Sequence, residues 1–374
     1  MARRNHIGLL GFAALLLWLT GCTPTGSPQP PLSAELMVGV KIYDYSGSFD
    51  DLIAAWAALG INTAFVSETF AADATFRELV RDQGIDTFVI APVFFNPEAL
   101  EQDPDLFAVT ADGHRAQDDW VQFVCPSRKT YREKRVQELV EWVRRLRPDG
   151  LSLDFIRHFV FWEMVDPETR AESLPNTCFC PHCLASFSTA SGVEIPDTLR
   201  NTGEIASWIQ AHHEPSWTTW KIDLITSMVE EIVREIRKVD PTVKVNIHAV
   251  PWRRDDYAGA IRRVAAQDFT ALSALADYLS PMCYSFMLER PPEWIHSVVQ
   301  DLDASSTAAI IPSIQVKESY REDERLGEEE FDLCLREALK PPSQGVVFWS
   351  WNALAQEPDK QSVIRQVLTE RDRG

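Results

Sequence analysis

The sequence predicts an α/β protein whose fold is a (β/α)8 TIM barrel with long loops after its third and fourth strands. Eight short apolar segments with the composition of buried strands alternate with eight amphipathic helical segments, which is the element order of such a barrel. A doubly wound open sheet is the competing fold. No glycine-rich phosphate-binding turn follows the first strand, however, so the barrel is favoured.

The expected elements follow from apolar periodicity. Strands are expected at residues 37–45, 62–67, 87–94, 150–157, 243–250, 278–284, 308–316 and 345–351. Helices are expected at residues 51–59, 75–83, 127–147, 217–239, 257–266, 292–302, 327–339 and 360–369. In a barrel of this kind, functional residues lie on the loops after the strands. The two longest of these loops, 95–126 and 158–216, therefore point to the functional site.

The first 34 residues are expected to lie outside the barrel, which forms one domain over residues 35–374. A positive segment precedes an apolar run, residues 7–19, that is too short to span a membrane and is typical of a signal peptide. The run ends in Leu-Thr-Gly-Cys22, which resembles the lipobox of bacterial lipoproteins. The resemblance implies that residues 1–21 are removed and that Cys22 carries lipid. An ordinary secretory signal is the alternative, but it leaves Cys22 without a function.

Residues 22–34 are rich in proline, serine and threonine and are expected to form a tether to the membrane surface. Thr23 stands where lipoproteins of the inner membrane typically carry aspartate, so we expect an outer-membrane location facing the periplasm or the exterior. Removing residues 1–21 takes away two arginines and no acids, which changes the net charge from −19 to −21. Such an acidic protein is not expected to bind nucleic acid or anionic lipid. Its expected membrane contact is the N-terminal lipid alone.

Four cysteines lie in the two long loops. Cys178, Cys180 and Cys183 form a C-x-C-x2-C motif, and Cys125 lies in the loop after the third strand. Four thiolates from two loops would form a closed tetrahedral structural zinc site that ties the loops together. Two disulfides are the alternative in an exported protein, but the close spacing favours a metal. A further alternative uses His182 as a ligand in place of one cysteine.

The main candidate for chemistry is Asp154, in the segment DGLSLDFIRH of residues 149–158. Leucine and phenylalanine alternate there with Ser152 and Asp154, and a carboxylate in such a strand is costly to bury without a partner. Asp154 is therefore expected near the carboxyl end of the strand, beside a cavity or polar groups. Arg157 and His158 follow it and could supply those groups. A structural ion pair between Asp154 and Arg157 is the alternative.

This segment resembles the DGIHLDYIRY strand of glycoside-hydrolase-like barrel proteins of the family-10-like group. The cysteine pattern is similar to that of family 42 β-galactosidases, which bind zinc with a cysteine after the third strand and a C-x-C-x2-C motif after the fourth. The resemblance implies a barrel glycosidase with Asp154 as a catalytic carboxylate. The sequence departs from family 42 because no Asn-Glu pair ends its fourth strand, and Ile156 replaces the glutamate of chitinase-like barrels. The acid and base roles of these families therefore do not transfer as a set.

Glycoside hydrolysis usually requires two carboxyl groups. The first is expected to be Asp154, acting as acid/base or as nucleophile. Glu318 leads the candidates for the second, because it follows the seventh strand, where many barrel glycosidases place a nucleophile. The other acids near strand ends, each expected to be solvated or paired, are Asp44, Glu68, Glu163, Asp255 and Asp256.

Aromatic and polar residues at the strand ends are suited to sugars, because aromatic rings stack on pyranose faces while polar neighbours bind hydroxyls. The expected substrate-binding residues are Arg157, His158, His248, Trp252, Tyr284, Gln315, Trp349 and Trp351. Trp349 and Trp351 occupy alternating positions of the last expected strand, so we expect both or neither to point inward.

The sequence thus predicts a lipid-anchored glycosidase of the bacterial cell envelope that cleaves an oligosaccharide or glycan. A non-catalytic glycan-binding lipoprotein on the same barrel is the alternative, and a scaffold for envelope assembly is a third possibility. A second carboxylate within reach of Asp154 is expected in the glycosidase and not in the glycan-binding lipoprotein. No motif for a serine nucleophile, a catalytic zinc or a phosphate-binding loop is present, so structural zinc is the one cofactor expected.

Overall fold

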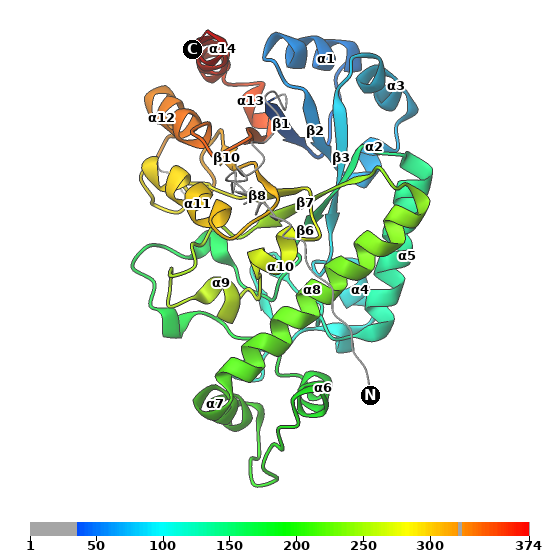
Figure 1. The fold of residues 1–374 in the computed structure, drawn as a ribbon, viewed down its shortest axis with the longest axis vertical. Helices are drawn as coiled ribbons and strands as arrows, with labels where there is room; N and C mark the ends of the chain where they lie inside the picture. Colours follow the sequence, from blue (N-terminus) through cyan, green and yellow to red (C-terminus); the bar gives the residue numbers. More distant parts are fainter. Residues whose placement is uncertain (1–35, 321–323, 374) are drawn as a thin grey trace, which may run out of the picture. The chain divides into compact units, whose positions relative to one another are not determined.

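Parallel strands form the barrel wall in the structure, a computed structural model that describes residues 36–320 and 324–373 (Figure 1). The strands, in their order around the barrel, are β1 (Met37–Ile42), β2 (Thr63–Val66), β3 (Asp86–Pro92), β6 (Gly150–Asp154), β7 (Lys244–Ala249), β8 (Tyr278–Pro281), β9 (Ala309–Ile310), β10 (Ser313–Gln315) and β11 (Gly345–Trp349). β9 and β10 are two halves of the seventh strand, interrupted at Pro312. β9 pairs with β8 and β10 with β11, and β11 pairs with β1, so the ring closes.

Helices cover the outside of this ring. The longer ones are α1 (Phe49–Ala58), α3 (Ala74–Asp82), α5 (Lys129–Leu146), α6 (Pro181–Ser191), α7 (Thr202–His212), α8 (Glu214–Val239), α11 (Glu293–Asp303), α12 (Glu328–Ala338) and α14 (Pro358–Asp372). The shorter ones are α2 (Glu68–Ala71), α4 (Pro97–Gln102), α9 (Ala260–Arg263), α10 (Phe269–Ser273) and α13 (Trp351–Leu354). The helices α6 and α7 belong to the loop after β6 and pack against α8 (Figure 1).

The predicted (β/α)8 fold is confirmed, with one helix much shorter than expected. Residues 257–266 were expected to be helical, but α9 covers only Ala260–Arg263. Tyr257, Ala258 and Ala266 have φ angles of 50°, 55° and 58°, in the left-handed region that a right-handed helix cannot include. The backbone therefore limits the helix on both sides.

Local sequence explains where several helices begin. The Asp73 carboxylate accepts hydrogen bonds from the backbone N–H groups of Thr75 and Phe76 and so caps α3. Ser48 caps α1 in the same way through the N–H of Asp51. These caps satisfy donors that the first helical turn leaves without partners.

The barrel interior contains a polar layer built from neighbouring strands. Ser152 Oγ lies 2.9 Å from His248 Nε2, Asn246 donates to Ser152 Oγ over 2.8 Å, and Ser280 donates to Asn246 Oδ1 over 2.8 Å. All four side chains are buried, and their mutual hydrogen bonds offset the cost of removing them from water. Because side chains alternate along a strand, Asp154 faces the same way as Ser152. It lies two residues further along β6, at the carboxyl end of the strand.

The predicted signal peptide, the tether and Cys22 lie outside the described residues. Among the residues that the structure describes, no helix is both long enough and apolar enough to cross a membrane.

Two leucines test the packing of the helical layer. Leu52 on α1 is 1% exposed, whereas Leu333 on α12 is 50% exposed. We expect Leu52→Ala to lower the free energy of unfolding by about 2–5 kcal/mol, because the truncation leaves a cavity, and Leu333→Ala to change it by less than about 0.5 kcal/mol. Urea unfolding of both variants measures the difference, and equal losses would contradict the packing of α1 against the barrel.

Candidate active site

A cavity of about 330 Å³ lies at the carboxyl ends of the barrel strands. Its wall combines the ends of β1, β3, β6, β8 and β11 with residues of the loops that follow β3, β6 and β10. The lining residues are Lys41, Tyr43, Ile90, Pro92, Phe95, Trp120, Asp154, Phe155, Arg157, Trp162, Glu163, Met282, Tyr284, Tyr320 and Trp349. The cavity is therefore where a barrel enzyme places its catalytic residues.

Asp154 is the last residue of β6, and its carboxylate is held by the backbone that follows. Its Oδ1 accepts a hydrogen bond from the N–H of Phe155 over 2.7 Å. Phe155 has a φ of 49°, a strained conformation for a bulky residue, and its ring stacks on Phe95 with centroids 4.7 Å apart. Burial raises the pKa of Asp154, while the charge of Lys41, the Phe155 N–H and Arg157 oppose the rise. These three groups favour the ionised form.

Glu163 supplies a second carboxyl group to the same cavity. It lies in a 3₁₀ turn, Trp162–Met164, of the long loop after β6. Burial raises the pKa of Glu163 to about 7, and the negative charge of Asp154 adds to the rise while Arg157 opposes it. Its Oε2 is buried, with no hydrogen-bond partner among the described residues. Glu163 is thus a carboxyl group that is protonated about half the time near neutral pH.

Arg157 lies within the electrostatic influence of both carboxyl groups. Its guanidinium packs over the rings of Phe123 and Phe155 at 4.8 and 5.5 Å, and Nη1 donates to the Val160 carbonyl over 2.7 Å. Burial lowers the pKa of Arg157 to about 10, with Glu163 and then Asp154 opposing the shift, so it stays charged at neutral pH. Within the part of the chain that the structure describes, no direct ion pair joins Arg157 to Asp154. Arg157 therefore acts on Asp154 through its charge and not through a direct ion pair.

Lys41, on β1, contributes the other cation of the cavity wall. It is 1% exposed, and its Nζ donates to the Tyr284 hydroxyl over 3.1 Å. Burial lowers the pKa of Lys41 to about 8, and Asp154 opposes the shift. The Tyr284 ring stacks on Trp349 with centroids 4.5 Å apart and planes inclined by 17°. Two aromatic faces therefore lie beside the charged groups.

Three aromatic residues, Trp120, Phe161 and Tyr320, form a bridge at the solvent side of the cavity. Trp120 lies between β4 (Gln117–Asp118) and β5 (Val121–Gln122), and its Nε1 donates to the Tyr320 hydroxyl over 2.7 Å. Phe161 packs edge-on against both rings, at 5.9 and 5.7 Å. Trp120 and Tyr320 are 42% and 41% exposed, so they lie at the mouth of the cavity. This aromatic bridge joins the loop after β3 to the loop after β10.

The structure brings four of the sequence-predicted site residues together and separates the others from them. Those in the cavity wall are Asp154, Arg157, Tyr284 and Trp349. Those outside the wall are Glu318, His158, His248, Trp252, Gln315 and Trp351. Glu163 was only a minor candidate in the sequence, because a single glutamate in a long loop carries no pattern that marks it.

Two polar residues outside the wall make structural hydrogen bonds instead. The Gln315 side chain accepts from the Met287 N–H over 2.9 Å and donates to the Lys317 carbonyl over 3.0 Å. His248 belongs to the polar layer of the barrel interior, and burial lowers its pKa well below the usual range. His248 thus connects neighbouring strands, and Gln315 holds the loops that follow β8 and β10.

His158, Trp252 and Glu318 also face other parts of the molecule. His158 is fully buried, with Nδ1 3.5 Å from Thr177 Oγ1, in the segment that precedes the cysteine motif. Trp252 packs edge-on against Tyr257. Glu318 lies close enough to Lys360 to favour its charged form.

The expectation that Trp349 and Trp351 share a direction is wrong. β11 ends at Trp349, and Trp351 is the first residue of α13, so the strand alternation does not extend to it. Trp351 packs edge-on against Trp56 of α1 at 6.0 Å, whereas Trp349 lines the cavity.

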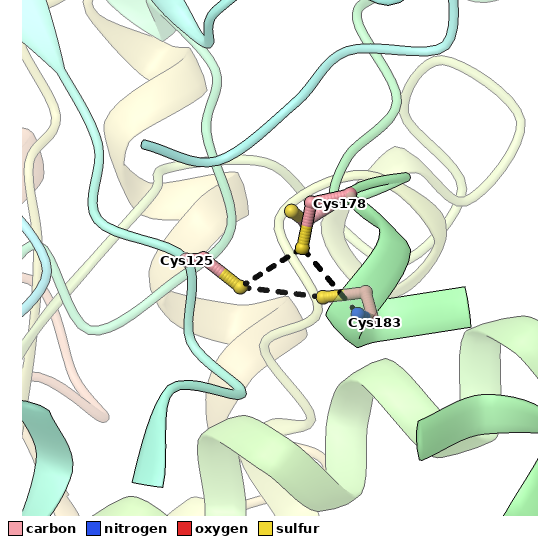
Figure 2. Close-up of side chains that lie close together, drawn as sticks. Cys125, Cys178 and Cys183 are labelled. Carbon is pink, nitrogen blue, oxygen red and sulfur yellow. Dashed lines mark hydrogen bonds between the residues drawn. The ribbon is translucent and has the colours of Figure 1, made fainter. Parts of the chain in front are cut away.

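The four loop cysteines converge in a buried cluster. The Sγ atoms of Cys125, Cys178, Cys180 and Cys183 lie within 4.8 Å of one another, and Figure 2 shows the labelled thiols pointing toward a common centre. Cys125 Sγ is 3.7 Å from Cys180 Sγ and 3.3 Å from Cys183 Sγ. All four are free thiols, so the structure does not contain the alternative disulfides. The cluster could hold a metal ion.

The surroundings of the cluster fit a thiolate-bound metal. The Val109 N–H donates to Cys178 Sγ over 3.2 Å, and the Cys183 N–H donates to Cys180 Sγ over 3.4 Å. Such N–H donors stabilise the negative charge of metal-bound thiolates. His182 is not part of the cluster, since its Nε2 lies 3.0 Å from the Ser127 carbonyl oxygen.

No family model matches the chain, and no curated protein matches it by sequence. Solved structures do match. They include a β-galactosidase from the psychrophilic Marinomonas ef1, with a TM-score of 0.68 and 12% identity over 90% of this chain and 60% of that one. The PgaB (BpsB) glycoside hydrolase domain from Bordetella bronchiseptica has a TM-score of 0.64 and 12% identity over 88% and 98%. Gan42B, a GH42 β-galactosidase from G. stearothermophilus, has a TM-score of 0.57 and 11% identity over 89% and 57%.

These similarities establish the fold. The protein has the barrel of glycoside hydrolases, including that of GH42 β-galactosidases. The chain spans about three-fifths of the length of the two β-galactosidases and nearly all of the Bordetella domain. At such low identity, a shared fold does not by itself assign an activity.

The coupling of the two carboxyl groups can be measured directly. We expect the Glu163 carboxyl to titrate near pH 7. Asp154→Asn should lower that pKa because it removes a neighbouring negative charge, and Arg157→Met should raise it because it removes a positive one. NMR titration of ¹³C-glutamate-labelled protein measures the shifts, with Glu163→Gln identifying the signal. Shifts of the same sign in both variants would contradict the arrangement.

Proposed function

We propose that the protein is a glycosidase that cleaves an oligosaccharide or glycan, with Asp154 and Glu163 as its two carboxyl groups. The observation that carries the proposal is that both groups line one cavity, where burial raises the pKa of Glu163 to about 7 while Lys41, the Phe155 N–H and Arg157 oppose the rise in the pKa of Asp154. Glycosidases need such a pair, one carboxyl group protonated and the other ionised. The barrel of glycoside hydrolases supports the same conclusion.

The environments assign the two roles. Glu163, with a pKa of about 7, retains a proton that it can donate to the oxygen of the leaving sugar. Burial raises the pKa of Asp154, but Lys41, the Phe155 N–H and Arg157 favour its ionised form, which is the form that can act as the nucleophile or as the base that activates water. Glu163 therefore replaces Glu318 as the leading candidate for the second carboxyl group.

The rest of the cavity suits a sugar. Stacked Tyr284 and Trp349 offer a broad aromatic surface, and Trp162 packs beside Tyr284 at 5.8 Å. Trp120 and Tyr320 add aromatic edges at the mouth. Aromatic walls with a few polar groups are the usual lining of sites that bind the apolar faces of pyranose rings.

Substitution of the two carboxyl groups tests the reaction. We expect Asp154→Asn and Glu163→Gln each to lower kcat/KM by about 10³-fold on a panel of glycans, because each removes an acid, base or nucleophile. Activity of the wild type should fall as the pH rises through about 7, where Glu163 loses its proton. Hydrolysis rates across pH measure both effects.

Glu318→Gln serves as the matched comparison, and we expect it to retain activity within about threefold because Glu318 lies outside the cavity wall. A large loss in Glu318→Gln with full activity in Glu163→Gln would refute the assignment. Sugar binding without hydrolysis in the wild type would favour a glycan-binding protein.

We also propose that the cysteine cluster binds structural zinc. Four thiolates at a Zn–S distance of about 2.3 Å are roughly 3.8 Å apart in a tetrahedron, which is close to the 3.3 and 3.7 Å separations found here. Four cysteine ligands leave no open position for a substrate or water, so the metal would supply stability rather than catalysis. The N-terminal sequence supports attachment of this domain to the cell envelope through lipid on Cys22.

Metal analysis tests the zinc proposal. We expect about one zinc per chain in the wild type and in Cys283→Ser, and loss of zinc with a lower Tm in Cys178→Ser. Cys283 is a matched control because it is also a buried free thiol but lies outside the cluster. Equal zinc in the two variants, or none in the wild type, would refute the proposal.

A further inference from the structure

Lys41 is a buried cation with unused hydrogen-bond donors in the cavity wall. An ammonium group has three N–H donors. Among the described residues, the Tyr284 hydroxyl is its single hydrogen-bond acceptor, and no carboxylate lies within ion-pair distance. The side chain is 1% exposed, so bulk water does not surround it. The remaining donors are therefore left for whatever occupies the cavity.

Arg157, the other cation of the wall, is already engaged. Its Nη1 donates to the carbonyl oxygens of Val160 and His158, and its guanidinium packs over Phe123 and Phe155. These contacts hold the group against the loop that carries Glu163. Arg157 is thus held by protein contacts on several sides, whereas Lys41 has a single protein acceptor and is the less engaged of the two cations.

The charges of the wall also leave a positive excess in the catalytic state. The charged residues that line the cavity are Lys41, Arg157, Asp154 and Glu163. When Glu163 carries the proton that it has to donate, two cations face one carboxylate. A buried charge without compensation is costly, so an anionic group on the ligand would be favoured there.

We propose that the cavity binds a sugar ring that carries a carboxylate, as uronic acids do, with the carboxylate on Lys41 beside the Tyr284 hydroxyl. This inference rests on the proposed glycosidase function and names its substrate class. The Tyr284–Trp349 stack then lies next to the carboxylate-binding position and is available to the ring. A charge-assisted hydrogen bond from the ammonium to the carboxylate is stronger than one to a neutral hydroxyl.

The net charge of the whole chain limits the ligand to a small one. At −21 after removal of residues 1–21, the protein repels extended polyanions. One acidic ring, at the end of a chain or between neutral rings, meets the local positive charge without bringing further negative charge to the surface. A polyuronate is therefore not the expected ligand.

Calorimetric binding of matched monosaccharides tests the proposal. The probes are glucuronate against glucose and galacturonate against galactose, at low and high salt. We expect at least one uronate to bind the wild type about tenfold or more tightly than its neutral counterpart, with a preference that weakens in salt. Lys41→Met should reduce the preference to less than about threefold, and Lys41→Arg should retain it because a positive charge remains to attract the carboxylate.

A wild type that binds each uronate no better than its neutral partner, or binds neither, overturns the inference whatever the variants do. A preference unchanged in a folded Lys41→Met protein also overturns it. Hydrolysis of aryl glycosides is measured in parallel to separate the two proposals. Cleavage of neutral glycosides alone refutes the acidic substrate but is consistent with a glycosidase. Uronate binding without cleavage of any glycoside supports the acidic ligand but refutes the glycosidase.

Discussion

A half-buried carboxylate at the end of a barrel strand has to be compensated, and the cavity is built around the compensation of Asp154. Lys41 comes from β1, the Phe155 N–H from a strained turn, and Arg157 from the next loop. In return, the charge of Asp154 stabilises the charged forms of Lys41 and Arg157 and raises the pKa of Glu163. The charge of Asp154 therefore acts on the pKa values of several neighbours, and its loss would shift all of them.

The two long loops position the rest of the cavity, and the cysteine cluster ties them together. One loop carries Trp120 and Cys125, and the other carries Glu163 and the C-x-C-x2-C motif. Backbone hydrogen bonds also connect the two loops, from the Ala111 N–H to the Asn176 carbonyl over 3.1 Å and from the Phe179 N–H to the Val109 carbonyl over 2.8 Å. Thiol contacts hold the two loops together at the cysteine cluster, and the aromatic bridge connects the loop after β3 to the loop after β10. Folding stability and the placement of Glu163 are thereby linked.

Most of the fold was predictable from sequence because apolar periodicity reports directly on strands and helices. The cysteine cluster was predictable for a similar reason, since close spacing brings thiols together locally. The second carboxyl group was not. Glu163 reaches the cavity through a loop path that no short pattern encodes, whereas Glu318 was favoured as a strand-end acid although β10 ends three residues earlier, at Gln315. Trp351 was misjudged because the strand ended before it.

An enzyme and a sugar-binding protein differ in how much folding free energy their binding cavity is expected to cost. Sugar recognition needs aromatic faces and hydrogen bonds, and neutral polar groups provide those at little cost. This cavity instead contains two carboxyl groups, of which Asp154 raises the pKa of Glu163, together with a glutamate oxygen that is buried without a partner among the described residues and a phenylalanine with positive φ. Each feature opposes folding, and such features persist mainly where function requires them. Acid-assisted cleavage of a glycosidic bond requires a pair of carboxyl groups, so the proposed glycosidase function accounts for these costs better than sugar binding alone.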